Sequence, residues 1–112
     1  MVIAIPCVER KLCQHFGHCQ EFSFVSVNPQ TKVVESVDYL VPPPHEPGVL
    51  PRWVAENGGT VVICGGMGSR AQQLFAQNGV AVVTGAPVND PETVVKRYLD
   101  GSLETGENAC SH

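Results

Sequence analysis

Four residues that commonly bind soft metals stand close together in the segment KLCQHFGHCQEF, residues 11–22: Cys13, His15, His18 and Cys19. Thiolate and imidazole groups suit zinc, copper(I), iron and iron–sulfur clusters far better than magnesium or calcium. The spacing C-x-H-x-x-H-C differs from the two separated ligand pairs of a zinc finger. The segment therefore indicates either a site for a metal or metal cluster, or a tight turn at Gly17 with ordinary side chains.

A second segment, CGGMGSRA at residues 64–71, carries glycines and one cation between an apolar run and an expected helix. Exposed backbone N–H groups at a helix start, together with the positive end of the helix dipole, favour an anion, and Arg70 adds a fixed charge. No Gly-Lys-Ser/Thr follows, as a Walker loop would require, and the spacing of Gly65, Gly66 and Gly68 misses the dinucleotide fingerprint. An anion site and a plain tight turn both fit this segment.

A third candidate is the C-x-H pair Cys110 and His112. We expect residues 105–112 to be a flexible tail, which could fold over a site and add both residues as metal ligands; an exposed thiol without a role is the alternative. Of the two other cysteines, Cys64 is expected in the core, and Cys7 stays undecided.

Hydrolytic or transfer chemistry has little support in the sequence. No G-x-S-x-G motif is present, and the nearest pair of carboxylates, Glu35 and Asp38, is expected on a solvent face. A nucleophile pair of Cys19 with His15 would lack a third group to orient it. We therefore predict that the protein is not an enzyme.

The elements that must position these residues follow from the hydrophobic pattern. The expected strands are 2–6, 21–27, 32–40, 60–66 and 80–85, and the expected helices are 49–59, 69–79 and 91–101. Asn28-Pro29 predicts an antiparallel hairpin, the Pro-rich stretch 41–48 an extended crossover, and Asp90 a cap for the last helix. This order predicts an α/β fold with a mixed five-stranded sheet and about three helices. The candidate loops should then meet at one edge of the sheet.

The composition is that of one compact domain, with 112 residues of which 43% are hydrophobic and 16% charged. The formal net charge is -4 and the pI is near 5.4, so nucleic acid is not an expected partner. No apolar run approaches the ~20 residues of a membrane span, and no secretory pattern opens the sequence. We expect a cytoplasmic protein whose five cysteines serve metal or redox chemistry rather than disulfides.

Three segments taken together, VIAIP, QHFGHCQEF and GGMGSRA, resemble the dinitrogenase iron-molybdenum cofactor biosynthesis family, with its small NifX-like and NafY-like cluster carriers and the C-terminal domain of NifB. The resemblance runs as far as YLDGSLETGE, close to the end of the sequence. It implies a ribonuclease-H-like three-layer domain without ribonuclease chemistry. It also implies a non-enzymatic role in binding or carrying a metal–sulfur cluster: the iron-molybdenum cofactor, its precursor or another iron–sulfur-type cluster.

The family's motif falls on Phe22 and on several residues that the resemblance implies are cofactor-binding. With His18 as a further donor of the first loop, the expected cofactor-binding set is His15, Phe16, Gly17, His18, Gly65, Gly66, Gly68 and Arg70. The expected metal ligands are Cys13, His15, His18, Cys19, Cys110 and His112. Within this set Cys19 stands where the family commonly has a small residue, and Cys13 and the Cys110/His112 pair are additional to the motif.

These extra soft donors leave two alternatives open: a mononuclear zinc or iron site or thiol-redox module, and a regulatory or scaffold module that binds a protein or small anion. We expect a single domain over residues 1–104, a monomer or homodimer, and proteins that donate and accept the cluster as partners.

Overall fold

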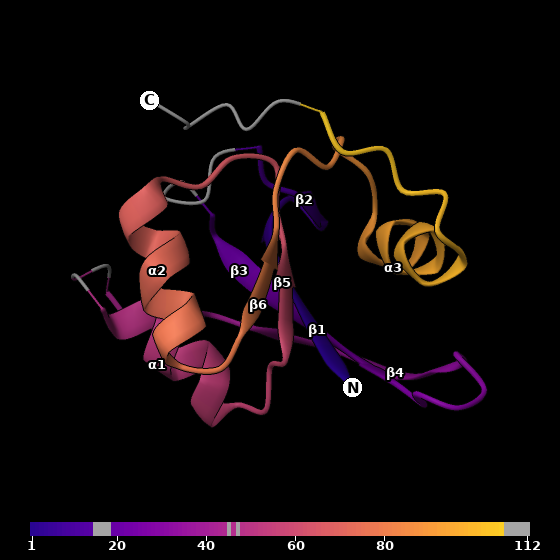
Figure 1. Ribbon diagram of the computed structural model, residues 1–112, viewed down its shortest axis with the longest axis horizontal. Helices are drawn as coiled ribbons and strands as arrows, with labels where there is room; N and C mark the ends of the chain where they lie inside the picture. Colours follow the sequence, from indigo (N-terminus) through magenta and orange to yellow (C-terminus); the bar gives the residue numbers. More distant parts are fainter. Residues whose placement is uncertain (15–18, 45, 47, 107–112) are drawn as a thin grey trace.

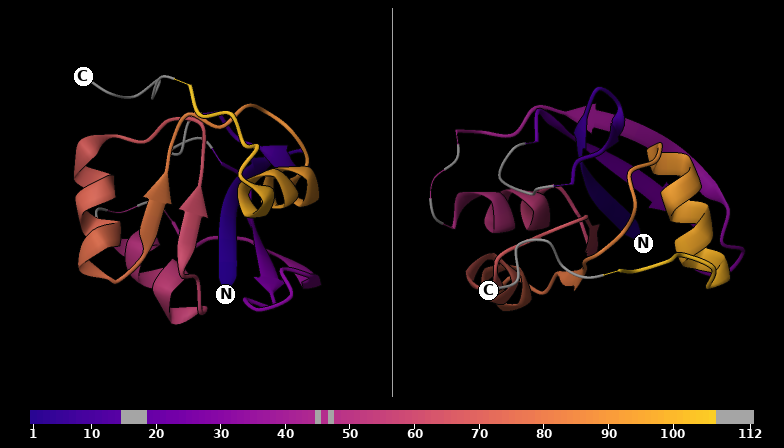
Figure 2. Two further views of the ribbon diagram at one scale, coloured as in Figure 1. Left: turned by 45° about the vertical axis from the view of Figure 1, so that its right-hand side comes forward. Right: turned by 90° about the horizontal axis from the view of Figure 1, so that it is seen from above.

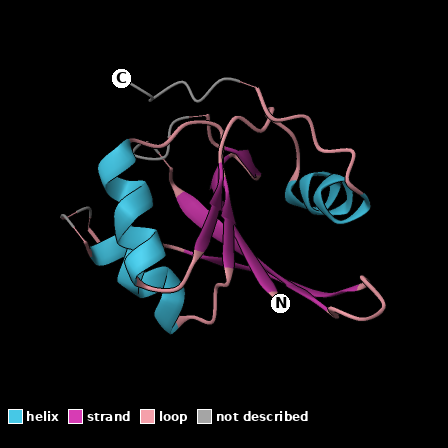
Figure 3. Ribbon diagram, in the orientation of Figure 1, coloured by secondary structure: helices cyan, strands magenta, loops and turns pink. Residues whose placement is uncertain are grey.

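A mixed sheet lies between two layers of helices in the computed structural model, which describes residues 1–14, 19–44, 46 and 48–106 (Figure 1). The strands are β1 (Val2–Val8), β2 (Lys11–Leu12), β3 (Glu21–Val27), β4 (Val34–Leu40), β5 (Val61–Ile63) and β6 (Ala81–Val83), and the helices are α1 (Val49–Glu56), α2 (Ser69–Gln77) and α3 (Pro91–Asp100). Helices α1 and α2 cover one face of the sheet and α3 covers the other (Figure 3). The predicted three-layer α/β architecture is confirmed.

The sheet has the order β4-β3-β1-β5-β6, with β2 paired to β1. Strands β1, β3 and β4 pair antiparallel, as the Asn28-Pro29 turn predicts, whereas β1, β5 and β6 run parallel. Each face of the sheet carries its own core. Ile3, Ile5 and Val25 pack with Val94 and Val95 of α3, whereas the other face buries Ala4, Phe22, Phe24, Val54, Val62 and Phe75.

Strand β2 was not predicted, so the sheet has six strands rather than five. It follows a two-residue turn in which Glu9 (φ 53°) and Arg10 (φ 64°) are both left-handed. Such turns usually contain Asn-Gly, and Glu-Arg gives no hint of one. Side-chain contacts hold the turn instead: the Arg10 guanidinium lies 3.7 Å from the centre of the Tyr39 ring and its Nε is 3.3 Å from a Glu21 carboxylate oxygen.

Strand β1 also runs past Pro6, where the prediction ended it. The Pro6 carbonyl accepts a hydrogen bond from Cys13 N (2.7 Å), on the side away from β3. The missing N–H of Pro6 lies on that same side, where pairing with β5 has already stopped at Ala4. Proline therefore removes no hydrogen bond between β1 and β3.

No helix within the described ranges is long and apolar enough to cross a membrane.

Candidate functional site

The candidate loops gather along one edge of the sheet. Strands β1, β5 and β6 are parallel, so the segments that follow them leave from their shared carboxyl edge, which is uppermost in Figure 1. We call this edge the rim; its described segments are 12–14, 19–20, 64–68, 84–90 and 103–106. Open α/β sheets commonly bind ligands outside the carboxyl ends of their strands.

The first two candidate loops touch at Gln14 and Gly65. A Cβ atom added to Gly65 would lie 2.7 Å from the Gln14 carbonyl oxygen and 2.9 Å from its Cα, so backbone packs on backbone. Only glycine permits this approach without a shift of the chain. Since Gln14 immediately precedes His15, the glycine loop lies beside the start of the histidine-bearing segment.

Two further rim segments join this contact through glycines. Gly85 N donates a hydrogen bond to Gly65 O (2.6 Å), and Gly106 N donates one to Gly85 O (2.7 Å). Gly85 has φ +81°, and a side chain there would collide with Gly106 O. Gly106 itself belongs to residues 105–112, the expected tail. The sequence analysis missed Gly85 and Gly106, although a glycine directly after an apolar strand was the available signal.

Cys13 and Cys19 lie at the two ends of the first loop. Cys13 N is bonded to Pro6 O, and Gln20 N, next to Cys19, donates to Cys7 O (2.9 Å), so both ends of the loop attach to the last residues of β1. Cys13 is buried and Cys19 is partly buried. This places both thiols at the carboxyl end of one strand.

Burial raises the pKa of two thiols near the end of β1, those of Cys19 and Cys7. It raises the pKa of Cys19 to about 12, with the proximity of Cys13 as the next cause. It also raises the pKa of Cys7 to about 11, against the favourable hydrogen bond with Ser23. Cys7 lies in the core, where its Sγ donates to Ile5 O at 3.3 Å, which answers the open question about this residue. At neutral pH the Cys19 thiol is protonated, so a metal must displace its proton to bind it.

Several candidate residues lie outside the described part of the chain: His15, Phe16, Gly17 and His18, and Cys110 and His112 in the tail. Among the residues that the structure describes, no three His, Cys, Asp or Glu side chains are grouped so as to hold a metal ion. Cys13 and Cys19 therefore do not form a complete site by themselves. A metal bound by Cys13 or Cys19 would need further donors from outside the described residues.

The glycine loop is only partly exposed. Gly65 and Gly66 are buried; only from Gly68 does the chain emerge, and Arg70 is exposed. Gly68 and Arg70 line a cavity of about 340 Å³ together with Leu50 and Leu74, whereas Cys13 lines a separate cavity of about 400 Å³. The structure thus brings Gly65 to the first loop, but it places Arg70 on the α1–α2 side.

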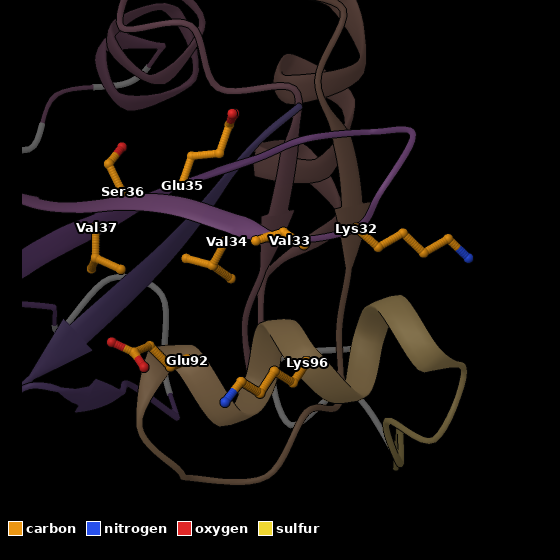
Figure 4. Close-up of a pocket in the computed structure, with 8 residues that line it drawn as sticks. All are labelled: Lys32, Val33, Val34, Glu35, Ser36, Val37, Glu92 and Lys96. Atoms are coloured by element: carbon orange, nitrogen blue, oxygen red, sulfur yellow. The ribbon is translucent and has the colours of Figure 1, made fainter.

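A third hollow, of about 690 Å³, lies away from the rim between β4 and α3 (Figure 4). Val34 and Val37 point from β4 toward α3, while Glu35 and Ser36 point away. Its lining holds two lysines and two glutamates and none of the candidate site residues. It offers no soft donor for a metal.

Several known proteins are similar to this chain in fold or in sequence. The chain shares its fold with the crystal structure of PH0822, at a TM-score of 0.84 and 31% identity over 95% of this chain and 96% of that one. The apo form of the orange protein from Desulfovibrio gigas has the same fold at a TM-score of 0.69 and 22% identity, over 96% of this chain and 94% of that one. The uncharacterized protein MJ0580 of Methanocaldococcus jannaschii is 29% identical over 96% of this chain and 92% of its own length.

The family model described as "Dinitrogenase iron-molybdenum cofactor" matches residues 1–101, which include every described rim segment except 103–106. The match covers both candidate loops in full and agrees with the family resemblance of their motifs. The chain belongs to the dinitrogenase iron-molybdenum cofactor family.

Proposed function

We propose that the protein binds and carries a metal–sulfur cluster at the rim and catalyses no reaction. The observation that carries this proposal is the contact between Gln14 and Gly65, which joins a loop with two cysteines and two histidines to the glycine loop before α2. The cargo would be the iron-molybdenum cofactor, its precursor or another iron–sulfur-type cluster. Donor and acceptor proteins for the cluster are the partners that a carrier needs.

Charge and donor chemistry support this assignment. With a net charge of -4, the chain as a whole repels an anionic cluster, so local donors must offset that field. Cys13 and Cys19 supply sulfur, His15 and His18 supply nitrogen, and thiolate and imidazole are suitable ligands for iron in clusters. The start of α2 lacks a side-chain cap, so its first N–H groups add a positive dipole on the same edge of the sheet.

The high pKa of Cys19 favours metal binding over the thiol-redox alternative. A thiolate is the reactive species in thiol exchange, and a pKa of about 12 leaves very little of it at neutral pH. A bound metal ion stabilises the thiolate directly and so offsets the cost of burying its charge. A redox partner offers no such stabilisation.

The test is anaerobic reconstitution with ferrous iron and sulfide, followed by visible absorbance and analysis for iron and acid-labile sulfide. We expect the wild-type protein to gain both, and His15→Ala and the double variant Cys13→Ser/Cys19→Ser to lose most of the absorbance. His45→Ala is the matched control, because it removes a histidine from the crossover rather than from a candidate loop. Folded wild-type protein that takes up no iron and sulfide would refute the proposal, and one zinc per chain without sulfide would favour a mononuclear site.

A further inference from the structure

Strand β4 forms one edge of the sheet and lies along the outer border of the molecule (Figure 2). Among the described residues it pairs with β3 alone, and no strand lies on its outer side. Exposed apolar residues gather at its two ends: Val33 is 57% exposed, Leu40 36% and Val41 79%. An edge of this kind is a template on which an extended segment of another chain can add as a further strand.

The hollow between β4 and α3 has room for the side chains of such a strand. Helix α3 packs on β3 and leaves this space, of about 690 Å³, beside β4. Val34 and Val37 point toward it from the strand (Figure 4). Successive side chains of a strand alternate between the two faces of a sheet, so every second side chain of an added strand would enter the hollow. The two lysines and two glutamates of its lining balance in charge, so the entering side chains should be apolar.

The opposite face of β4 is acidic. Asp38 pairs with Phe24, whose side chain belongs to the core under α1 and α2, so Asp38 points to that face of the sheet. Glu35 also points away from α3 (Figure 4). Both side chains are exposed, and neither forms an ion pair with a described residue. An added strand would therefore meet two uncompensated carboxylates on this face.

These features disfavour a second copy of β4 as the added strand. Two copies paired antiparallel about a two-fold axis place one residue opposite itself, and with Asp38 at that centre two carboxylates would face each other. A centre nearer the hairpin includes the bulge, where Glu35 is the extra residue. A centre nearer the other end includes Pro42, which has no N–H to donate. Charges and bulges of this kind keep a strand edge from pairing with its own copies.

We propose that the β4 edge binds an extended segment of another protein in which apolar and basic residues alternate. The apolar side chains enter the hollow against α3, and the basic side chains lie beside Glu35 and Asp38. Main-chain hydrogen bonds to β4 hold the segment, and the opposite charges select it. This edge lies away from the rim, so the inference does not depend on the proposed cluster site, and a partner bound here leaves the rim accessible.

The probe is a fluorescently labelled synthetic peptide of alternating valine and lysine, titrated with the full-length protein and followed by fluorescence anisotropy. A matched peptide with glutamate in place of lysine should bind roughly tenfold more weakly or worse, because it sets like charges opposite the two carboxylates. A valine–lysine peptide with methylated backbone amides should lose most of the binding, because it cannot donate hydrogen bonds to β4. Amide NMR shifts on binding should concentrate in β4 and α3.

A charge reversal provides the decisive variant. Asp38→Lys should weaken the valine–lysine peptide and strengthen the valine–glutamate peptide, and a reversed preference of this kind cannot arise from loss of folding. Glu104→Lys is the matched control, because it makes the same change of charge at an exposed residue away from β4 and should leave the preference unchanged.

Four results would overturn the proposal. They are absence of binding by the valine–lysine peptide, equal binding of the two peptides, full binding by the methylated peptide, and the same response of Asp38→Lys and Glu104→Lys. A wild-type dimer in sedimentation analysis that Asp38→Lys alters would show that a second copy occupies the edge instead. None of these measurements involves iron or sulfide, so their failure would leave the cluster proposal untouched.

Discussion

Two loops at the rim perform the same structural task with different chemistry. Each connects a parallel strand to a helix: residues 64–68 join β5 to α2, and residues 84–90 join β6 to α3. The start of α3 is closed by its own sequence, because Asp90 accepts from Thr93 N at 3.1 Å and from Thr93 Oγ1 at 2.8 Å, and Pro91 follows. The start of α2 has Gly68 as its cap residue and no side-chain cap bond.

The difference indicates which loop is built for stability and which for contact. A capped start satisfies its N–H groups internally, and those groups are then not offered to a ligand. In the β5–α2 loop the glycines instead permit close approach: Gly65 to Gln14, and Gly65 O to Gly85 N. We infer that the capped start of α3 serves the fold, whereas the uncapped start of α2 leaves its first N–H groups available for contact; Gly65 and Gly85 hold the neighbouring segments of the rim together in both loops.

The largest expected effect comes from Gly65→Ala. The new Cβ would press on backbone atoms of Gln14, which cannot rotate away, so we expect the protein to lose about 2 kcal/mol of unfolding free energy and to load less iron and sulfide. Chemical denaturation and the reconstitution assay measure the two effects. Gly68→Ala is the control, because its Cβ would meet nothing within 4 Å. Equal stability of the two variants would mean that the Gln14 contact is not a constraint.

The same two loops show which features of the structure can be predicted from the sequence. Asp90 and Pro91 predict the start of α3 correctly, because a cap acts between residues that are close in the chain. Positions of the loops also follow from strand order, so their gathering at one edge could be expected. The sequence does not predict which atoms touch there, because the Gln14–Gly65 contact joins residues fifty-one positions apart and depends on the register of β1 against β5.

Strand β2 and the continuation of β1 past Pro6 were not predicted from the sequence, for a similar reason. The Glu9-Arg10 turn is held by Tyr39 and Glu21, which lie on other strands, and local propensity argues against it. Pro6 is tolerated only because its missing donor faces a side where pairing has stopped. In both places tertiary contacts override the local signal.

A smaller effect should follow from removing the cap of α3. Asp90→Ala should cost about 1 kcal/mol of unfolding free energy without changing iron and sulfide loading. The Thr93 hydroxyl and N–H hold the pKa of Asp90 below its usual value, so the charged cap stabilises the fold above that usual value, and this stabilisation is lost as pH falls through the lowered pKa. Denaturation midpoints from pH 2 to 6 should therefore depend less on pH in Asp90→Asn than in wild type; an unchanged profile would contradict the role of the charge.

The smallest change tests the comparison from the other side, by giving α2 the kind of cap that α3 has. Gly68 has extended backbone angles (φ -65°, ψ 155°) and open space at its Cβ, so Ser or Asp fits there. Gly68→Ser and Gly68→Asp should each raise the unfolding free energy by about 0.5 kcal/mol, because either side chain can accept from the first N–H groups of the helix. The two differ in charge, and an anionic cluster should be repelled only by aspartate. We therefore expect Gly68→Asp to load less iron and sulfide than Gly68→Ser at equal stability. Equal loading would show that the start of α2 is not part of the binding surface, and it would leave the proposed role of the thiols unaffected.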